Sequence, residues 1–346
     1  MTFSIVIATY NRAVVLRDTL ASLARLTTDV PWEVIVVDNN SPDDTRQVVE
    51  AASATFPVPL RYAFEREQGR SAALNHGFRL AAGDIIVTTD DDVRVEPGWL
   101  NAIRATLDTF GCDYVGGRVT PIFEEPSLPE WFPPKPGLLW GVIALLDYGP
   151  KAVKFGARVP LGVNMAMRRD AIERAGGFDP AIGRKAGTLL GQEVREWCLR
   201  AHAAGLVGYY SPDIVVEHLI PADRLTKKYF RRWFYWRGIS RAMLYADTGL
   251  DMEKPAQSSI DFTTVRHIAG VPRYLFRSAL TAARDAITAM MRGDHMTSFD
   301  REMWLWTFAG IVRQRWIDRR RPIRAAATRR GGAAEETTRA RIVPTS

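Results

Sequence analysis

Three consecutive carboxylates, Asp90-Asp91-Asp92, follow the largely apolar run Asp84–Thr89. The run is short and mostly β-branched, which is typical of a buried strand. Carboxylate oxygens are hard ligands, so three of them at the end of a strand could hold Mg²⁺ or Mn²⁺. The alternative is a solvated acidic turn ahead of the next helix, with Pro97 at its first position.

Polar side chains also follow two other predicted strands. Asn11 comes after the strand at Ser4–Tyr10, and Asp38 ends the strand at Glu33–Asp38. In sheets whose strands alternate with helices, ligands bind beyond the carboxyl ends of the strands. We therefore expect Asn11, Asp38 and Asp90 on one rim of the sheet, which favours a binding site over a local turn.

The elements that must position these residues alternate through the first 120 residues. Strands are predicted at Ser4–Tyr10, Glu33–Asp38, Leu60–Phe64 and Asp84–Thr89. Helices are predicted at Arg12–Leu26, from about Pro42, at Ser71–Ala81 and at Pro97–Phe110. This alternation indicates an α/β fold with a mainly parallel central sheet sandwiched by helices.

The second half of the chain is less regular. A proline-rich connection runs from Pro121 to Pro136, and we expect basic, aromatic helices beyond Thr226 and a solvated tail after Arg319. Between them we expect a helix at about Gln192–Ala204, short strands at Leu206–Tyr210 and Ile214–Glu217, and His218 at the strand exit.

Bulk composition narrows the class of protein. The chain has 346 residues and a formal charge of +7, with the excess of Lys and Arg mostly after Arg224. Its two cysteines, Cys112 in a predicted strand and Cys198 in a predicted helix, form no disulfide framework, which fits a reducing cytoplasm. We find no signal peptide, and no apolar stretch of the roughly 18–20 residues that a spanning helix needs.

The order of several short motifs resembles that of the family 2 inverting glycosyltransferases, which have the GT-A fold. The motifs are Ile7-Ala8-Thr9-Tyr10-Asn11-Arg12, Val36-Val37-Asp38-Asn39-Asn40-Ser41, Gly69-Arg70-Ser71-Ala72-Ala73-Leu74-Asn75-His76-Gly77, Asp90-Asp91-Asp92, Gly176-Gly177-Phe178-Asp179, Gly191-Gln192-Glu193 and His218. Each is weak alone, but their order over roughly Ser4 to Gly238 makes a strong signal.

The resemblance also implies a division of the chain. Residues 1–222 would form the GT-A domain, with a nucleotide-sugar half at about 1–120 and an acceptor half at about 121–222. A basic aromatic helical extension would follow at 223–320, and a disordered tail at 321–346.

For the nucleotide sugar, the resemblance assigns Asp38 to the nucleobase, where a carboxylate can accept a hydrogen bond from a pyrimidine N–H. It places Ala8, Thr9, Tyr10 and Arg12 around the base and ribose, and Arg70 and Asn75 against the nucleotide. Arg70 would act from a helix start, where backbone N–H groups favour anions. Asp90 would face the ribose or a metal-bound water. Asp91 is grouped with these residues, although the middle carboxylate is expected to point away from the other two.

The same resemblance makes Asp92 a ligand of a divalent cation, Mg²⁺ or Mn²⁺, that stabilises the leaving diphosphate. His218 would complete the metal shell, which suits Mn²⁺ better than Mg²⁺. The alternative for His218 is a hydrogen-bonded structural histidine.

Inversion requires a carboxylate that accepts the proton of the attacking hydroxyl. The family supplies it from a Glu-Asp pair at a late helix, whereas this chain has Gln192-Glu193. Glu193 is the carboxylate common to both possible registers and is our candidate base, with Glu196 or Asp179 as substitutes. Alternatively, Glu193 only complements the helix dipole.

Dense cations and aromatic residues alternate from Asp223 to Arg237, and Arg313–Arg324 is also basic. Such segments favour contact with an anionic membrane surface. An amphipathic helix with aromatic core residues is the alternative. Nucleic acid is an unexpected partner, because no DNA- or RNA-binding signature accompanies the segment.

The sequence thus predicts an inverting glycosyltransferase on the inner face of the cell membrane. It would use a nucleotide-diphosphate sugar, UDP first, to extend a glycan or lipid-linked acceptor of a cell-surface polysaccharide, seated near Trp131 to Trp140. Nucleotidyltransfer and NAD-dependent chemistry are disfavoured, since no glycine-rich loop follows a predicted strand. A binding module that has lost catalysis remains the rival, because the Gln192-Glu193 pair departs from the family.

Overall fold

The computed structural model describes residues 1–125, 127–156, 158–245 and 266–320. The tail predicted at 321–346 lies outside the described residues, as does the stretch 246–265 of the predicted helical extension.

One sheet organises the first 220 residues, with the strand order β3-β2-β1-β4-β8-β6-β9-β5, and with β7 paired to β9. The strands are β1 (Phe3–Thr9), β2 (Trp32–Asp38), β3 (Leu60–Phe64), β4 (Ile85–Thr89), β5 (Val93–Val95), β6 (Tyr114–Phe123), β7 (Val153–Lys154), β8 (Met165–Arg168) and β9 (Gly208–Ile220). Strands β3, β2, β1 and β4 are parallel, as are β6 and β9, whereas β5, β7 and β8 run antiparallel to their neighbours. The predicted α/β fold is confirmed, and the sheet becomes mixed beyond β4.

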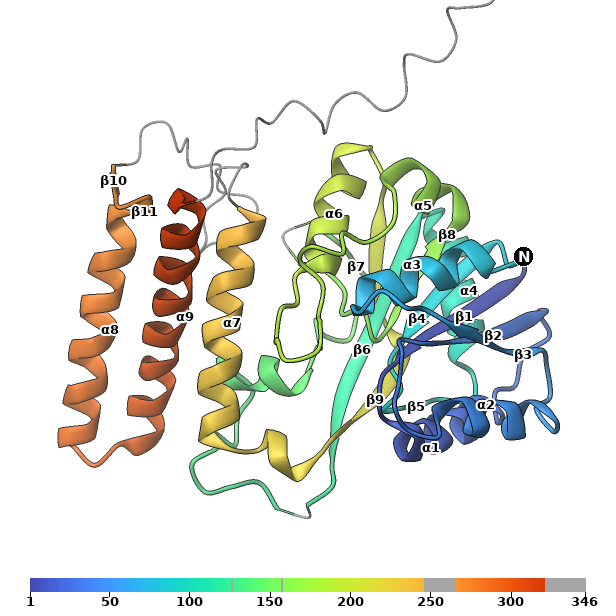
Figure 1. The fold of residues 1–346 in the computed structure, drawn as a ribbon, viewed down its shortest axis with the longest axis horizontal. Helices are drawn as coiled ribbons and strands as arrows, with labels where there is room; N and C mark the ends of the chain where they lie inside the picture. Colours follow the sequence, from blue (N-terminus) through green and yellow to red (C-terminus); the bar gives the residue numbers. More distant parts are fainter. Residues whose placement is uncertain (126, 157, 246–265, 321–346) are drawn as a thin grey trace, which may run out of the picture.

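Helices cover both faces of this sheet (Figure 1). They are α1 (Ala13–Leu23), α2 (Thr45–Ser53), α3 (Arg70–Leu80), α4 (Trp99–Phe110), α5 (Arg169–Ala175) and α6 (Glu193–Ala203). Helices α3, α5 and α6 lie on one side, and α1 and α2 lie on the other. Two short 3₁₀ helices, η1 (Leu138–Ile143) and η2 (Ala222–Arg224), belong to the connections.

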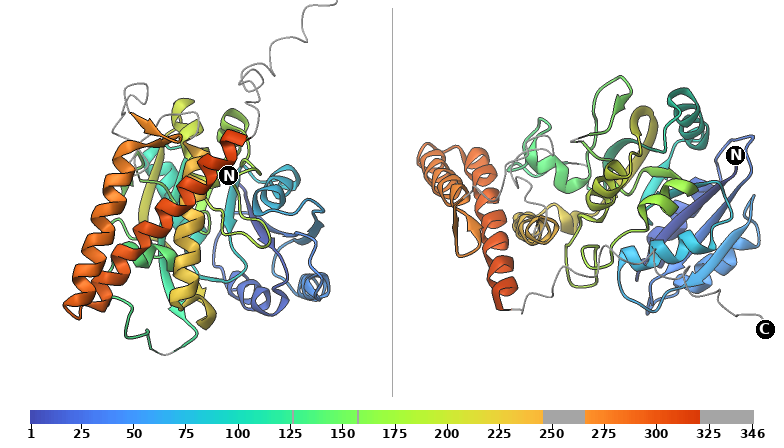
Figure 2. Two further views of the ribbon diagram at one scale, coloured as in Figure 1. Left: turned by 60° about the vertical axis from the view of Figure 1, so that its left-hand side comes forward. Right: turned by 90° about the horizontal axis from the view of Figure 1, so that it is seen from above.

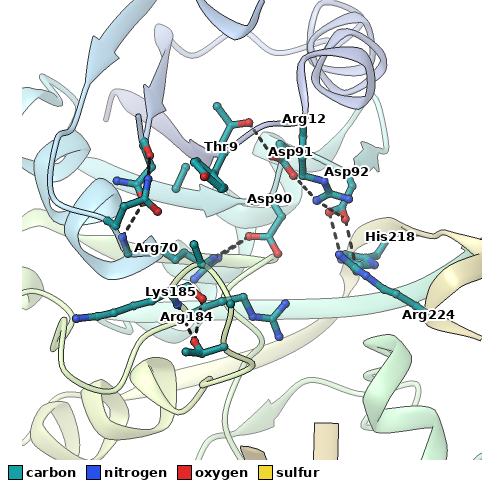
Figure 3. A pocket seen from close by; sticks show the side chains of 18 residues that line it. Thr9, Arg12, Arg70, Asp90, Asp91, Asp92, Arg184, Lys185, His218 and Arg224 are labelled. Atoms are coloured by element: carbon teal, nitrogen blue, oxygen red, sulfur yellow. Dashed lines mark hydrogen bonds and ion pairs between the residues drawn. The ribbon is translucent and has the colours of Figure 1, made fainter. Parts of the chain in front are cut away.

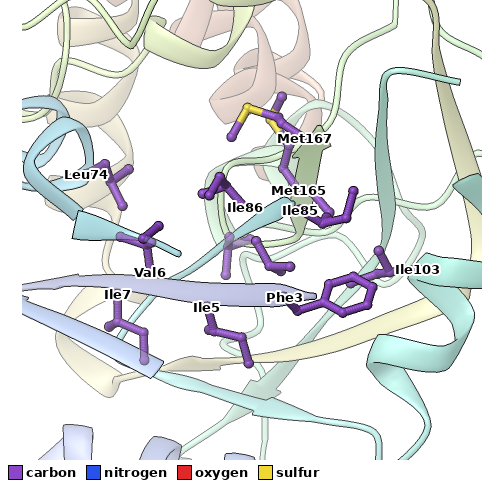
Figure 4. Close-up of a cluster of buried hydrophobic side chains, with 14 of the residues drawn as sticks. Phe3, Ile5, Val6, Ile7, Leu74, Ile85, Ile86, Ile103, Met165 and Met167 are labelled. Atoms are coloured by element: carbon purple, nitrogen blue, oxygen red, sulfur yellow. The ribbon is translucent and has the colours of Figure 1, made fainter. Parts of the chain in front are cut away.

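Burial on both faces explains why the strands are almost continuously apolar. In β1, Val6 points toward Leu74 of α3, while Ile5 and Ile7 point to the opposite face (Figure 4). All three β1 side chains are fully buried. Packing on both faces of the sheet holds the parallel strands in place. The segments that follow these strands all begin at the same edge of the sheet, the rim formed by the carboxyl ends.

Two details near this rim differ from the sequence prediction. A three-residue strand, β5, follows the aspartates directly, and it is too short to have been recognised. The two short strands predicted around Pro212 form one strand, β9, because a bulge absorbs the turn-like residues: Gly117 pairs with Ser211 and Arg118 with Val215. His218 therefore lies inside β9, opposite Val93, and not at its exit.

Smaller corrections concern the neighbouring segments. Strand β6 runs to Phe123, so the irregular connection begins at Glu124 and not at Pro121. Cys112 lies in the turn after α4 and not in a strand. Cys112 and Cys198 are both buried free thiols.

Three helices form a separate layer at the other end of the molecule: α7 (Lys227–Leu244), α8 (Arg273–Met291) and α9 (His295–Arg320). A small hairpin of β10 (His267–Ile268) and β11 (Val271–Pro272) precedes α8. The outermost helix of this layer is α8 (Figure 2). None of the helices in the described ranges combines the length and the apolar composition needed to cross a membrane.

The aromatic residues of α7 serve mainly as core. Phe230 and Phe234 are fully buried, and Phe230 packs against Trp131 with ring centroids 5.2 Å apart. Trp131 also contacts Phe299 of α9, at 5.1 Å. The proline-rich connection is thus bound to α7 and α9, and the basic aromatic segment is an amphipathic helix whose phenylalanines are not available to a membrane.

Helices α7 and α9 also touch through their backbones. A Cβ atom at Gly238 of α7 would overlap the carbonyl oxygen of Thr307, and one at Gly310 of α9 would overlap the carbonyl oxygen of Tyr235. Only glycine permits so close a crossing at both contact points.

Candidate active site

A cavity of about 370 Å³ lies at the rim where β1, β2 and β4 end (Figure 3). We call it the first cavity. The loop at 184–188 closes one side of it, opposite the aspartates. The residues predicted from sequence that line it are Ala8, Thr9, Tyr10, Arg12, Arg70, Asp90, Asp91, Asp92 and His218.

Each aspartate of the triplet has a cationic partner. Asp90 is 2.6 Å from Arg70, and Asp91 is 2.6 Å from Arg12 and accepts a hydrogen bond from the Thr9 hydroxyl at 2.7 Å. Asp91 and Asp92 are only 4% and 2% exposed, so the triplet is not a solvated turn. Asp91, the middle carboxylate, is directed to Thr9 and Arg12, and the residue is among those that line the cavity.

The two buried carboxyls have pKa values displaced in opposite directions. Burial is the largest influence on Asp91 and raises its pKa, because the attraction of Arg12 offsets it only in part. Burial also raises the pKa of Asp92, but the close approach of His218, Arg12 and Arg224 outweighs it and lowers that pKa well below the usual range. The surroundings of Asp92 therefore favour its anionic form more strongly than those of Asp91 do.

Asp90, Asp92 and His218 could hold a metal ion together. Their ligand atoms lie within 4.8 Å of one another. His218 Nε2 is 3.2 Å from Asp92 Oδ1, and Arg12 is 2.8 Å from Oδ2, yet neither buried oxygen has a hydrogen bond of good geometry. Buried oxygens without such bonds are costly unless a ligand completes them. Two carboxylates and an imidazole are a donor set that suits Mn²⁺, so these residues fit a divalent cation.

Asp38 does not line the first cavity. It is 3% exposed, and its carboxylate accepts hydrogen bonds from the Ser41 backbone N–H at 2.8 Å and the Tyr62 hydroxyl at 2.8 Å. The neighbouring Asn39 lines the cavity instead. In this structure the carboxylate predicted to bind the nucleobase is therefore occupied by the protein itself.

Asn75 also lies away from the first cavity. Its side chain donates to the Phe178 carbonyl at 2.7 Å and accepts from the Phe178 N–H at 2.8 Å. A Cβ atom at Gly177 would collide with the Asn75 amide, which explains a glycine at that position. Asn75 thus fastens the Gly176–Asp179 motif to α3, and its predicted contact with the nucleotide has no support in the geometry.

Glu193 begins α6 and lies in a second cavity of about 210 Å³. The second cavity shares Arg70, Asp90 and His218 with the first. Glu193 is 6% exposed, and its Oε1 is 3.2 Å from Arg70, while Oε2 is buried without a hydrogen-bond partner. Arg70 therefore joins Asp90 of one cavity to Glu193 of the other.

The two substitutes for Glu193 are placed elsewhere. Glu196 forms two hydrogen bonds with Arg200, at 2.6 and 2.7 Å, and Asp179 accepts from the Ala181 N–H at 2.8 Å. Neither residue lines the first or the second cavity.

Sequence reasoning missed several residues that line the first cavity: Asn39, Gln68, Arg184, Lys185 and Arg224. The Arg184 carbonyl accepts a hydrogen bond from the Arg70 N–H at 2.8 Å, which fixes the loop against α3. Arg224 of η2 lies 3.7 Å from Asp92. The loop at 184–188 has no motif of its own, so only its basic pair could have indicated an anion site.

A nine-stranded α/β sheet whose carboxyl rim carries paired aspartates, arginines and a cation-compatible cluster defines a GT-A-type glycosyltransferase. The sequence profile described as Glycosyl transferase family 2 matches residues 4–176, half of the chain. The chain belongs to the family 2 glycosyltransferases.

Curated relatives carry matching descriptions. A validoxylamine A glucosyltransferase of Streptomyces hygroscopicus is 36% identical over 142 residues, which cover 38% of this chain but only 33% of the relative. In Haloferax volcanii, a glucosyl-dolichyl phosphate glucuronosyltransferase is 25% identical over 70% of this chain and 77% of its own. The glycosyltransferase AglE of the same organism is 28% identical, over 66% and 70%.

Solved structures have the same fold. A mannosyltransferase of Pyrobaculum calidifontis, in complex with GDP-Man and Mn²⁺, superposes with a TM-score of 0.56 at 17% identity, covering 91% of this chain and 87% of its own. TarS of S. aureus in complex with UDP-GlcNAc gives 0.50 at 16% identity, over 87% and 90%.

Proposed function

We propose that this chain is an inverting, metal-dependent glycosyltransferase that moves a sugar from a nucleotide-diphosphate sugar to a glycan or lipid-linked acceptor. The nucleotide that we propose is UDP. The observation that carries the proposal is that two cavities lie side by side and share Arg70 and Asp90 as lining residues. One has the cation-compatible cluster, and the other has a carboxylate oxygen without a partner. Membership of the family supports sugar transfer from a nucleotide sugar.

The donor occupies the first cavity in this proposal. Asp90, Asp92 and His218 hold the divalent cation, which when bound neutralises negative charge growing on the leaving diphosphate. Arg184 and Lys185 line the cavity from the loop opposite the aspartates and attract the phosphates. Asn39 and Tyr10 line the part of the cavity left for the nucleoside.

The acceptor enters the second cavity. Glu193 Oε2 accepts the proton of the acceptor hydroxyl as that oxygen attacks the anomeric carbon from the face opposite the diphosphate. Arg70 lies between Asp90 and Glu193 and limits the repulsion between the two carboxylates. Attack from that face inverts the anomeric configuration.

A thermal-shift screen tests the proposed function. The full chain is heated with UDP-, GDP- and dTDP-sugars, each with and without Mn²⁺. A ligand at 100 times its Kd stabilises a fold by roughly 2.7 kcal/mol, so we expect the melting temperature to rise by a few degrees, most with a UDP-sugar and only with Mn²⁺. If no nucleotide sugar raises the melting temperature, the proposal is wrong. If a GDP- or dTDP-sugar raises it more than a UDP-sugar does, only the choice of UDP as the nucleotide is wrong.

We also propose that the enzyme works on the inner face of the membrane, with α8 as its contact. Leu280, Ile287 and Met291 lie on one exposed stripe of α8, at 73%, 55% and 78% exposure. Arg277 and Arg284 lie on the same stripe and are exposed. An exposed stripe of apolar and cationic side chains matches an anionic lipid surface.

Sedimentation with vesicles tests this contact. We expect the triple variant L280S/I287S/M291S to lose most of its binding to phosphatidylglycerol-containing vesicles. It should keep its nucleotide-sugar shift, because no residue of α8 lines either cavity. The control is V14S, which removes an equally exposed apolar side chain (75%) on α1. If the triple variant sediments like the native chain, α8 is not the contact.

A further inference from the structure

The second cavity has a wall that does not belong to the sheet. Tyr229, Trp233, Arg237 and Ser240 of α7 form this wall, and Glu193 lies in the same cavity. Because the family profile ends at residue 176, this wall comes from a part of the chain that the family pattern does not describe.

Arg237 differs from the other arginines of this region. Arg70 is paired with Asp90 and Glu193, and Arg224 lies 3.7 Å from Asp92. In the described ranges, no ion pair joins Arg237 to a carboxylate, and its guanidinium lies 5.9 Å from the ring centroid of Trp233.

The surroundings of Arg237 are unfavourable for a cation. Burial lowers its pKa to about 9, and the nearby positive charges of Arg241 and Arg195 act in the same direction. The Arg237 side chain is half-buried, and a cation partly removed from water is less stable unless it is paired with an anion. Contact with the aromatic faces of Trp233 and Phe234 compensates only in part. A ligand anion would supply the missing pairing.

We propose that Arg237 binds an anionic group, a phosphate or a carboxylate, that the acceptor carries beside the sugar to be extended. The inference rests on the proposed function, since it requires that the acceptor occupy the second cavity. The planar guanidinium matches both anions through two parallel hydrogen bonds. With the anion at Arg237, the acceptor hydroxyl points to Glu193, so Arg237 also selects which hydroxyl reacts.

Titration calorimetry with the full chain tests the proposal, with UDP and Mn²⁺ filling the first cavity. The probes are citronellyl phosphate and methyl β-glucuronide, each compared with its neutral analogue, citronellol or methyl β-glucoside. We expect at least one anion to bind more tightly than its analogue. In R237Q its affinity should fall by roughly 30-fold or more, as for the loss of one partner of a buried charge pair. R237K should recover part of the affinity, and the melting temperature shows whether each variant is folded.

The controls separate this inference from the proposed function. R17Q removes an exposed arginine of α1 that lines neither cavity and should leave both anions bound as in the native chain. A loss confined to citronellyl phosphate assigns the site to a lipid phosphate, and one confined to the glucuronide assigns it to an acidic sugar. If neither anion binds better than its analogue, or R237Q binds both equally well, the inference is wrong. If none of UDP, GDP and dTDP binds the native chain with Mn²⁺, it is the proposed function that fails.

Discussion

Replacing Asp92 by asparagine should reduce transfer from the nucleotide sugar by roughly a thousandfold or more, equivalent to about 4 kcal/mol of transition-state stabilisation. Asp92 is the carboxyl whose pKa is lowered, so it supplies a fixed negative charge where a cation would bind. Asparagine keeps the shape and removes that charge. Initial rates with and without Mn²⁺ measure the loss, and Mn²⁺ binding followed by electron paramagnetic resonance gives a readout independent of turnover.

The matched control is D84N. Asp84 precedes the opposite end of the same strand, its side chain is 65% exposed, and it caps the chain terminus by bonding Thr2. We expect this variant to keep native turnover and Mn²⁺ affinity. Undiminished turnover or Mn²⁺ binding in D92N would remove Asp92 from the metal site.

Glu193→Gln should lower the transfer rate by roughly 10²–10⁴, the usual size of a general-base contribution, and leave donor binding nearly unchanged. The reason is the position of Glu193, which lines the second cavity and not the first, and is ion-paired with Arg70. The measurement is kcat for transfer, together with the thermal shift produced by the donor.

E196Q provides the comparison within the same helical turn. Glu196 is bonded to Arg200 and lines neither cavity, so its variant should lose some stability and little activity. Equal kinetics for E193Q and the native chain would reassign the base. Absence of transfer in the native chain, despite donor binding, would instead favour a binding module.

The first 110 residues could be predicted in detail because their signals are local. Short β-branched runs such as Ile85–Thr89 alternate with amphipathic segments, and parallel order brings the strand ends to one rim. The place of the triplet on the rim follows from that geometry, whereas Arg12 and Arg70 were assigned from the resemblance to the family. Strand β9 was divided in two, since Ser211-Pro212-Asp213 has the composition of a turn, and a bulge is invisible without its partner strand.

The remaining differences between prediction and structure concern contacts between residues that are distant in the sequence. Asn75 bonds Phe178 across 103 positions of the chain, and Asp38 bonds Tyr62 across 24. Both residues were predicted to bind the nucleotide from their position in the motifs alone. No local sequence pattern shows whether a polar side chain contacts a ligand or another part of the protein. For the same reason the sequence did not distinguish Arg237 from the other Lys and Arg residues of α7, which do not line the second cavity.

The glycine crossing of α7 and α9 has a consequence for the acceptor. With Gly238 against Thr307 and Gly310 against Tyr235, no side chain lies between the two backbones to act as a compliant spacer. Trp233 and Arg237 are carried on a helix that shifts only together with its partner. In the proposed function, the α7 wall that contacts the acceptor is therefore rigid. Its distance from Glu193 is set by how the C-terminal helices pack against the sheet. Changes of acceptor in related chains should accordingly be accompanied by altered packing in this layer, with the donor rim left as it is.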